Sequence, residues 1–278
     1  MRLLILFLVV VTITTTSCVR NNVVNRSEYQ KIFDKYGVQG TFGTLDNAYN
    51  EFSIYNLSTF RDSACSPVSS FNLVLNLTAI ELAKVTDNQV VAWNGVQYAN
   101  ETWNRTQTFS EAQKNNTQWY YQYLAKAIGK DTLQQYLDTL KYGSKKIIGT
   151  VDSCWLNNTL TIRADEQLGL VKKLYFNQLS NLYSNRTMAK VKNAMLVKKT
   201  DKYSLSYQSG IGAGKAGKTI LWAIGWVEYG GAATPKVSFF VLQGFVMANA
   251  SIFTTLEALV AKQQGLLTEL LTAEKLLP

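Results

Sequence analysis

The stretch Ser66-Pro-Val-Ser-Ser-Phe-Asn-Leu-Val-Leu-Asn-Leu-Thr-Ala-Ile-Glu81 places small hydroxyl side chains directly before an apolar run with helical spacing. If a helix begins near Ser69, then Ser69, Asn72 and Asn76 stand at positions i, i+3 and i+7 and share one face. Apolar residues fill nearly all other positions, which predicts a helix buried on every side. A polar stripe on a buried helix faces either a binding site or an interior hydrogen-bonded network. Ser69 then has two interpretations, an N-cap residue or a nucleophile, and the stretch alone leaves both open.

Composition limits the chemistry available to such a serine. The 278 residues are 47% hydrophobic, which allows one large domain or two small ones. Histidine is absent, so Ser-His-Asp triads, Cys-His dyads and His-ligated zinc sites are excluded. The net charge is +9, but Lys and Arg are scattered without a dense block, which favours a generally basic surface over nucleic-acid binding. We expect neither a metal nor a cofactor.

The N-terminus has the pattern of an export signal. The apolar run Leu3–Val11 is too short to span a bilayer, and small residues follow it up to Cys18. This predicts a signal peptide at 1–17, lipid attachment at Cys18 and a tether at 18–29. The protein is then an exported bacterial protein, a periplasmic lipoprotein or one held at the membrane by its lipid anchor alone. Plain secretion is the alternative, because Thr15 stands where such sites usually have Leu.

Two further cysteines, Cys65 and Cys154, would enter an oxidising compartment. A disulfide between them is possible, but the sequence favours two separate thiols. Their pairing, like the oligomeric state, is not decided by the sequence.

Strand patterns near both ends of the chain enclose a helical middle. We expect the two strand pairs to be hairpins of one antiparallel sheet, with the helical segment inserted as a second lobe. A cleft between the lobes is then the default binding site. The predicted elements are strands at 38–44, 52–55, 219–227 and 236–242, and helices at 116–128, from 131 to a stop at Gly143, at 165–179 and from 252 to about 276.

One segment fits a nucleotide-binding pattern that we reject. Gly212-Ala-Gly-Lys-Ala-Gly-Lys-Thr219 matches G-x-x-x-x-G-K-T. A phosphate-binding loop of this type needs a helix at its Lys-Thr end. The following residues, Ile220–Val227, are rich in β-branched and aromatic types and predict a strand instead. We interpret the segment as a Gly/Lys-rich turn and keep nucleotide binding only as a minor alternative.

Several collinear motifs carry a resemblance to one family. The nucleophile helix of class D (oxacillinase-type) serine β-lactamases contains Ser-x-x-Lys within Pro-Ala-Ser-Thr-Phe-Lys, and the opening stretch resembles it. The other matches follow in the same order from about residue 30 to the end. They are Trp93-Asn-Gly, Trp103-Asn-Arg-Thr, Tyr121-Gln122 with Ile128-Gly129, Tyr142-Gly-Ser144, Val151-Asp-Ser-Cys-Trp-Leu156, Gly225-Trp-Val-Glu228 and Glu274-Lys-Leu-Leu-Pro278.

The resemblance implies a mixed α+β (α/β) fold of the β-lactamase/transpeptidase type, an antiparallel sheet flanked by terminal helices plus an all-helical lobe. It places this domain at 30–278, with the α/β lobe at about 30–60 and 195–278 and the helical lobe at about 61–194. It also implies that Ser69 is the nucleophile. Trp155, which in the family shields the base lysine, is then expected to cover residue 72.

Every other signature that carries the family's chemistry is altered. Asn72 stands where the family has its carbamylated lysine base, and an amide is not a useful base at neutral pH. Asn116-Thr-Gln118 aligns with the Ser-x-Val proton relay, and Gln208-Ser209-Gly210 aligns with the Lys-Thr-Gly strand whose cation attracts the substrate carboxylate. In the family an arginine on the last helix often assists in binding that carboxylate, but none occurs between Leu256 and Leu271.

These changes favour a binder of penicillin-type β-lactams, or of a peptidoglycan-like small molecule, over an efficient hydrolase. A lost general base typically lowers a rate by about two to four orders of magnitude. We therefore predict weak hydrolysis or none, as in a pseudoenzyme. The alternative is an active β-lactam hydrolase that uses a rerouted base. Lys84 lies too far along the helix for that role, and Lys215 and Lys218 are candidates only for reaching a carboxylate.

Overall fold

The structure is a computed structural model that describes residues 22–86, 89–230, 236–247 and 255–278. A seven-stranded sheet forms its centre, in the order β1-β3-β2-β9-β8-β7-β6. Neighbouring strands are antiparallel, except that β1 runs parallel to β3. The strands are β1 (Val23–Asn25), β2 (Gln39–Asp46), β3 (Glu51–Tyr55), β6 (Leu196–Lys199), β7 (Tyr203–Ala213), β8 (Lys218–Tyr229) and β9 (Lys236–Met247), and β4 (Val90–Val91) pairs with β5 (Gln107–Thr108) in a separate ribbon.

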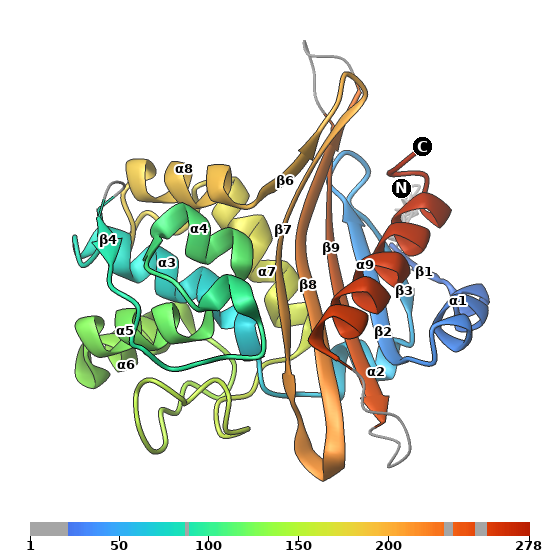
Figure 1. Ribbon diagram of the computed structural model, residues 1–278. Helices are drawn as coiled ribbons and strands as arrows, with labels where there is room; N and C mark the ends of the chain where they lie inside the picture. The colour runs from blue at the N-terminus through green and yellow to red at the C-terminus, as the bar shows by residue number, and fades with distance from the viewer. Residues whose placement is uncertain (1–21, 87–88, 231–235, 248–254) are drawn as a thin grey trace, which may run out of the picture.

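Helices cover both faces of the sheet (Figure 1). The first and last helices pack on one face, and the middle of the chain forms the helical lobe beside the other. Short 3-10 turns η1 (Ser27–Tyr29), η2 (Val68–Phe71), η3 (Glu101–Trp103) and η4 (Lys215–Gly217) connect some of the elements. The α-helices are α1 (Gln30–Lys35), α2 (Leu57–Asp62), α3 (Asn72–Glu81), α4 (Phe109–Asn115), α5 (Gln118–Ile128), α6 (Lys130–Leu140), α7 (Ala164–Tyr175), α8 (Asn185–Ala194) and α9 (Leu256–Ala273).

The two-sided cover explains the continuous apolar runs of the central strands. In β8, Ile220, Trp222 and Ile224 belong to the core shared with the helical lobe, whereas Leu221 and Ala223 belong to the core under α1 and α9. Successive side chains of a strand point to opposite faces, so a strand buried on both faces has no polar face. The expected fold class is confirmed, and both predicted hairpins lie in this one sheet.

Most sequence predictions of elements hold, with differences at their ends. Helix α5 begins at Gln118, two residues after the predicted start, because Asn116 takes a left-handed conformation (φ 53°) that ends α4. Helix α6 ends at Leu140 and not at Gly143, because Lys141 is left-handed. Helix α7 likewise ends at Tyr175, four residues before the predicted end.

The first and last described segments of the chain are in contact with each other. Glu274 Oε1 accepts hydrogen bonds from Arg26 Nε at 3.0 Å and from the Tyr29 hydroxyl at 2.7 Å. Strand β1, within the range expected to be a tether, pairs with β3. The predicted signal peptide and Cys18 lie outside the described residues, as does the predicted start of the last helix at 252.

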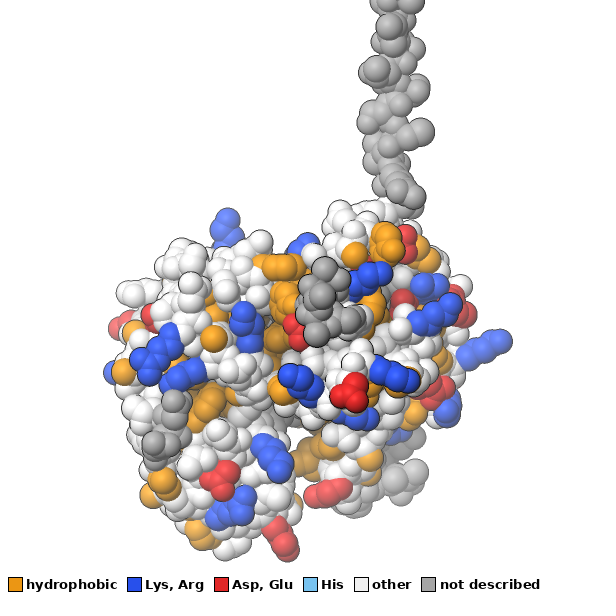
Figure 2. Space-filling model, turned by 90° about the horizontal axis from the view of Figure 1, so that it is seen from above, with side chains coloured by type: hydrophobic (Ala, Val, Ile, Leu, Met, Phe, Trp, Pro, Cys, Tyr) orange, Lys and Arg blue, Asp and Glu red, His pale blue; other side chains and the backbone are white. Residues whose placement is uncertain are grey.

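Two features of the described residues relate to the predicted location and partners: the length and apolarity of the helices, and the distribution of charge on the surface. No described helix is both long enough and apolar enough to cross a membrane. On the face drawn in Figure 2, Lys and Arg side chains are dispersed between uncharged and acidic ones and do not form one block. This distribution agrees with the generally basic surface expected from composition.

The substitution Gly210→Ala tests the close packing of β7 against the turn that carries Ser69. A Cβ at position 210 would lie 2.4 Å from the backbone nitrogen of Ser70, so β7 or the turn before α3 would have to shift. We expect a loss of unfolding free energy of about 1–3 kcal/mol, as for other overpacked sites, measured by urea denaturation.

Gly169→Ala is the matched control, because Gly169 lies within α7 with nothing within 4 Å of a built Cβ. This change should leave stability unchanged or raise it by about 0.5–1 kcal/mol. Equal stability of the two variants would contradict the close packing of β7 against the turn.

Candidate functional site

The serine singled out by sequence lies in a strained turn. Ser69 belongs to η2, and the preceding Val68 has φ of 42°, a left-handed conformation that a β-branched residue rarely adopts. The Ser70 N–H and hydroxyl both donate to the Pro67 carbonyl, at 3.0 and 2.6 Å. Neither η2 nor α3 uses the Ser69 hydroxyl as a cap, so the N-cap interpretation is wrong. Such strain is typical of functional turns.

Strand β7 passes directly over this turn. Beyond Tyr207, whose N–H donates to the Met195 carbonyl, the outer edge of β7 has no paired strand. The Ser209 carbonyl points from this edge toward the helical lobe and accepts from Asn116 Nδ2 at 3.3 Å. Alternate residues of a strand present their backbone groups to the same edge, so the Ile211 N–H lies on this side too. It is a backbone donor beside Ser69, of the kind that stabilises a developing oxyanion.

Ser69, Asn116 and Ser209 converge on one cavity of about 460 Å³. The half-buried Ser69 side chain lies on its wall. Trp103 and Gln118 contribute from the helical lobe, and the first two turns of α9 close the side opposite that lobe. The cavity is therefore formed where the helical lobe, the free edge of β7 and the last helix meet, as expected for a cleft between lobes.

Behind the cavity, amide side chains join the lobes. A backbone carbonyl only accepts, so the Asn116 group that faces the Ser209 carbonyl is its NH2. Asn116 Oδ1 then accepts from Asn72 Nδ2 at 2.6 Å. The side-chain oxygen of Asn72 is left buried without a partner among the described residues. The two predicted residues Asn72 and Asn116 are thus paired with each other.

A second chain of amides begins at the same strand. Gln208 Nε2 donates to the Ser209 carbonyl at 3.0 Å and to the Ser69 carbonyl at 3.3 Å, which fixes its orientation. Gln208 Oε1 accepts from Gln113 Nε2 at 2.7 Å, and Gln113 Oε1 accepts from Asn76 Nδ2 at 2.6 Å. The five residues of the two chains (Asn72, Asn76, Gln113, Asn116 and Gln208) are called the amide network below.

The network contains no group that can serve as a base at neutral pH. Among the described residues, the one ionisable side chain hydrogen-bonded to the network is Tyr121, whose hydroxyl donates to Gln113 Oε1 at 2.8 Å; burial raises the pKa of that hydroxyl. Within the described part of the chain, no hydrogen bond joins the Ser69 hydroxyl to another side chain. The serine is therefore exposed to the cavity without a proton acceptor beside it.

The other predicted site residues lie nearby in different roles. Gly210 gives β7 its close approach to the Ser70 backbone. Trp155 is buried and stacks on the Phe71 ring, with the ring centroids 5.5 Å apart. Trp155 does not line the Ser69 cavity. Its indole contacts Phe71, the residue before Asn72, within the core.

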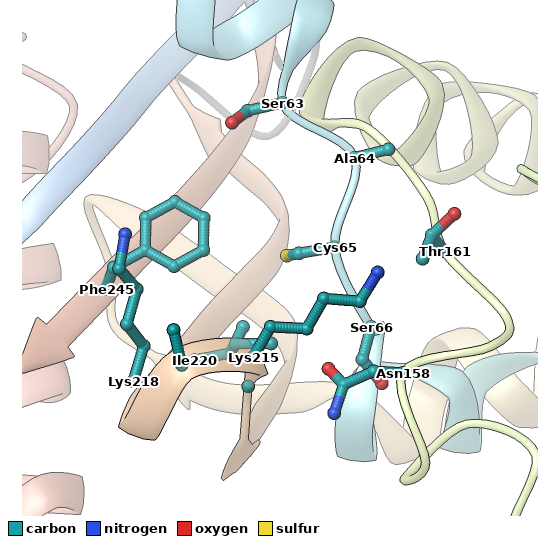
Figure 3. Close-up of a pocket in the computed structure, with 12 residues that line it drawn as sticks. Ser63, Ala64, Cys65, Ser66, Asn158, Thr161, Lys215, Lys218, Ile220 and Phe245 are labelled. Atoms are coloured by element: carbon teal, nitrogen blue, oxygen red, sulfur yellow. The ribbon is translucent and has the colours of Figure 1, made fainter.

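The Gly/Lys-rich segment forms the turn between β7 and β8, as expected, and is followed by a strand and not a helix. It lines a second, smaller cavity of about 240 Å³ with Ser66, Asn158 and Thr161 (Figure 3). Lys215 and Lys218 line this second cavity and not that of Ser69. This arrangement argues against the suggestion that either lysine reaches a carboxylate bound at Ser69.

Both described cysteines are free thiols, as predicted. Burial raises the pKa of Cys65 to about 12, and it does the same for Cys154. Gln243 Nε2 donates to the Cys65 sulfur at 3.1 Å. Both thiols are protonated at neutral pH, which makes them poor nucleophiles. No group of three His, Cys, Asp or Glu in the described ranges is arranged to hold a metal.

Gln113 is the site residue that sequence reasoning missed. It lies in α4, whereas the prediction began a helix only at 116. The signal for α4 is present, because Thr108-x-x-Glu111 is a capping box in which each side chain accepts from the other residue's backbone N–H. A helix ending at Asn115 would have placed Gln113 beside Asn116 at the lobe junction.

Comparison with known proteins agrees with the fold. Residues 24–242 match the family described as penicillin binding protein transpeptidase domain. The chain is 30% identical over 206 residues to the regulatory protein BlaR1 of Bacillus licheniformis; the match covers 74% of this chain and 34% of BlaR1, so the chain spans about a third of that relative. It is 31% identical to β-lactamase OXA-20 of Pseudomonas aeruginosa over 73% of this chain and 74% of that enzyme.

Among solved structures, the C-terminal domain of the Bacillus licheniformis BlaR penicillin receptor has a TM-score of 0.81 and 26% identity, over 92% of this chain and 98% of that domain. The chain belongs to the penicillin-binding protein transpeptidase-domain family. The resemblance to class D β-lactamases is thereby confirmed, with a penicillin receptor as an equally similar relative.

The substitution Gln113→Ala tests the amide network. It removes the partner of Gln208 Oε1, of Asn76 Nδ2 and of the Tyr121 hydroxyl in one step. Buried polar groups left without partners cost about 1–3 kcal/mol, so we expect a loss of unfolding free energy of that size, measured by urea denaturation. Gln135→Ala in α6 is the control, because Gln135 is exposed. A Gln113→Ala variant as stable as this control would show that the network does not stabilise the lobe junction.

Proposed function

We propose that this protein binds penicillin-type β-lactams at Ser69 and hydrolyses them weakly or not at all. One observation carries the proposal: Ser69 lines the cavity, but the positions of both family lysines hold neutral amides that bond to neighbouring amides. Similarity to a penicillin receptor supports a binding role, and similarity to β-lactamases supports the ligand class. A peptidoglycan-like small molecule is the corresponding natural ligand.

The chemistry of capture needs less from the site than turnover does. In capture, Ser69 Oγ forms a bond to the lactam carbonyl carbon, the carbon–nitrogen bond breaks, and the hydroxyl proton ends on the lactam nitrogen by way of solvent. Turnover adds the attack of a water molecule on the resulting ester, which again requires a base. A missing base lowers the rate of that attack by about two to four orders of magnitude, so an ester that has formed is hydrolysed slowly and no efficient cycle follows.

We propose export together with this function. A signal peptide at 1–17 and a lipid on Cys18 would place the domain outside the cytoplasmic membrane, where β-lactams and peptidoglycan fragments are encountered. Mass spectrometry of the protein isolated from membranes tests this part. A diacylglyceryl-modified Cys18 at the mature N-terminus is the expected result.

The wild-type protein should form a stable mass adduct with a β-lactam and turn over nitrocefin slowly. We expect one added ligand mass on Ser69 by intact-protein and peptide mass spectrometry, and no adduct on Ser69→Ala. The absorbance change of nitrocefin should stop near one equivalent. Rapid, continued hydrolysis that Ser69→Ala abolishes would instead establish an active enzyme with a rerouted base.

Asn72→Lys should raise nitrocefin hydrolysis by about two orders of magnitude if the base alone is missing. A lysine there would lie one turn from Ser69, and the Asn116 oxygen that now accepts from Asn72 would be its neighbour. Asn72→Met is the control, since it adds a side chain of similar length without a base. If Asn72→Lys with Gln208→Lys also remains inert although folded, the altered lysine positions do not explain the low activity.

A further inference from the structure

The cavity that contains Ser69 is almost free of charge. Of its described lining residues, only Lys114 and Glu257 are ionisable; they have opposite signs and both are exposed. Amides, hydroxyls and apolar groups make up the rest of the lining, among them Asn116, Ser209 and Ile211. The wall beside Ser69 therefore offers hydrogen bonds without a counter-ion for a buried anion.

Gln208 cannot substitute for the missing cation. Its NH2 group already faces three acceptors, the carbonyls of Ser69 and Ser209 at 3.3 and 3.0 Å and Asn116 Oδ1 at 3.4 Å. An NH2 group has only two N–H bonds, so no donor of Gln208 is left for a ligand. Its side-chain oxygen is used by Gln113 at 2.7 Å, and the residue is 2% exposed.

The groups around this position would also repel an anion. The free edge of β7 presents the Ser209 carbonyl, and Asn116 turns its oxygen toward Asn72 and Gln208. A carboxylate would lose its hydration and gain only neutral donors, with no cation to offset its charge. An ester or a carboxamide carries no charge and loses much less on entry. The donor left for it is a neutral one, the second N–H of Asn116.

We infer that this site selects acyl ligands in which the group beside Asn116 and Ser209, in front of the buried Gln208, is uncharged, an ester or carboxamide, and that it discriminates against a carboxylate there. The inference rests on the proposed function, since it concerns the same cavity and the same serine. The acyl step is unchanged: Ser69 Oγ bonds the carbonyl carbon, the leaving bond breaks, and the proton passes to the leaving atom.

A β-lactam acid and its methyl ester provide the test. With benzylpenicillin and its methyl ester at equal concentration, we expect the wild-type protein to form the ester adduct about tenfold faster, measured by intact-protein mass spectrometry. Faster modification by the acid would overturn the inference and leave the proposed function in place. Absence of any adduct would overturn covalent capture. The preference for the ester would then be decided by the equilibrium binding measurement described next.

Equilibrium binding to the Ser69→Ala variant, which cannot be acylated, separates the preference for an uncharged ligand from covalent capture. We expect the ester to bind with a dissociation constant about tenfold below that of the acid, measured by calorimetry. Equal affinities, tighter binding of the acid, or no binding of either compound would each overturn the inference. Both dissociation constants are measured on the same folded variant, so their ratio does not depend on a second substitution.

Two lysine changes identify the responsible position. Gln208→Lys in the Ser69→Ala background should reverse the order and favour the acid, whereas Gln135→Lys, an equal charge on exposed α6, should preserve the preference for the ester. Lys114, at the exposed edge of the cavity, is the alternative partner for a carboxylate. If Lys114→Gln weakens binding of the acid tenfold, and Lys84→Gln on the exposed end of the same lobe does not, Lys114 binds the carboxylate and the inference is wrong.

Discussion

The structure depends on the close approach of strand β7 to the turn that carries Ser69. At Gly210 the two backbones leave no room for a side chain, since a Cβ would stand 2.4 Å from the Ser70 nitrogen. This contact fixes the free edge of β7 beside the serine, so that the Ser209 carbonyl faces the helical lobe. The shape of the cavity and the orientation of every amide behind it follow from that position.

The amide network shows how a site can keep the geometry of its family without its charges. The resemblance to class D β-lactamases aligns Asn72 and Gln208 with two lysines of that family, and both amides are held by neighbouring amides at 2.6 to 2.7 Å. Neutral hydrogen bonds of this kind contribute about 0.5–1.5 kcal/mol each and need no counter-ion. The lobes therefore remain joined although no charge is available at those two positions to bind or activate a ligand.

Loss of charge has different consequences for the two halves of a β-lactamase cycle. Capture is helped by a strained serine turn and a backbone donor at the edge of β7, both of which are present here. Release of the captured acyl group needs a base that activates water, and the amide network contains none. A domain with the first and not the second would retain its ligand, which is the reasoning behind the binding role proposed above.

Much of this fold was accessible from sequence because it follows from local pattern. The buried helix after Phe71, the strands on either side of Gly230 and the turn at Gly212–Thr219 all have a clear period or clear turn residues. Strand β7 was recovered only through the resemblance to the family, since its small and polar residues give no strong alternation. The helix containing Gln113 was missed because its capping box was not used.

By itself, the sequence determined which chemistry is absent: a chain without histidine, and with amides at positions 72 and 208, has neither a histidine base nor a lysine base at those positions. Tertiary structure alone decided how those amides are oriented and that Gln208 has no donor to spare. The reason is that an amide has two nearly equivalent ends, and only a neighbouring backbone carbonyl, brought from a distant strand, distinguishes the end that donates from the end that accepts.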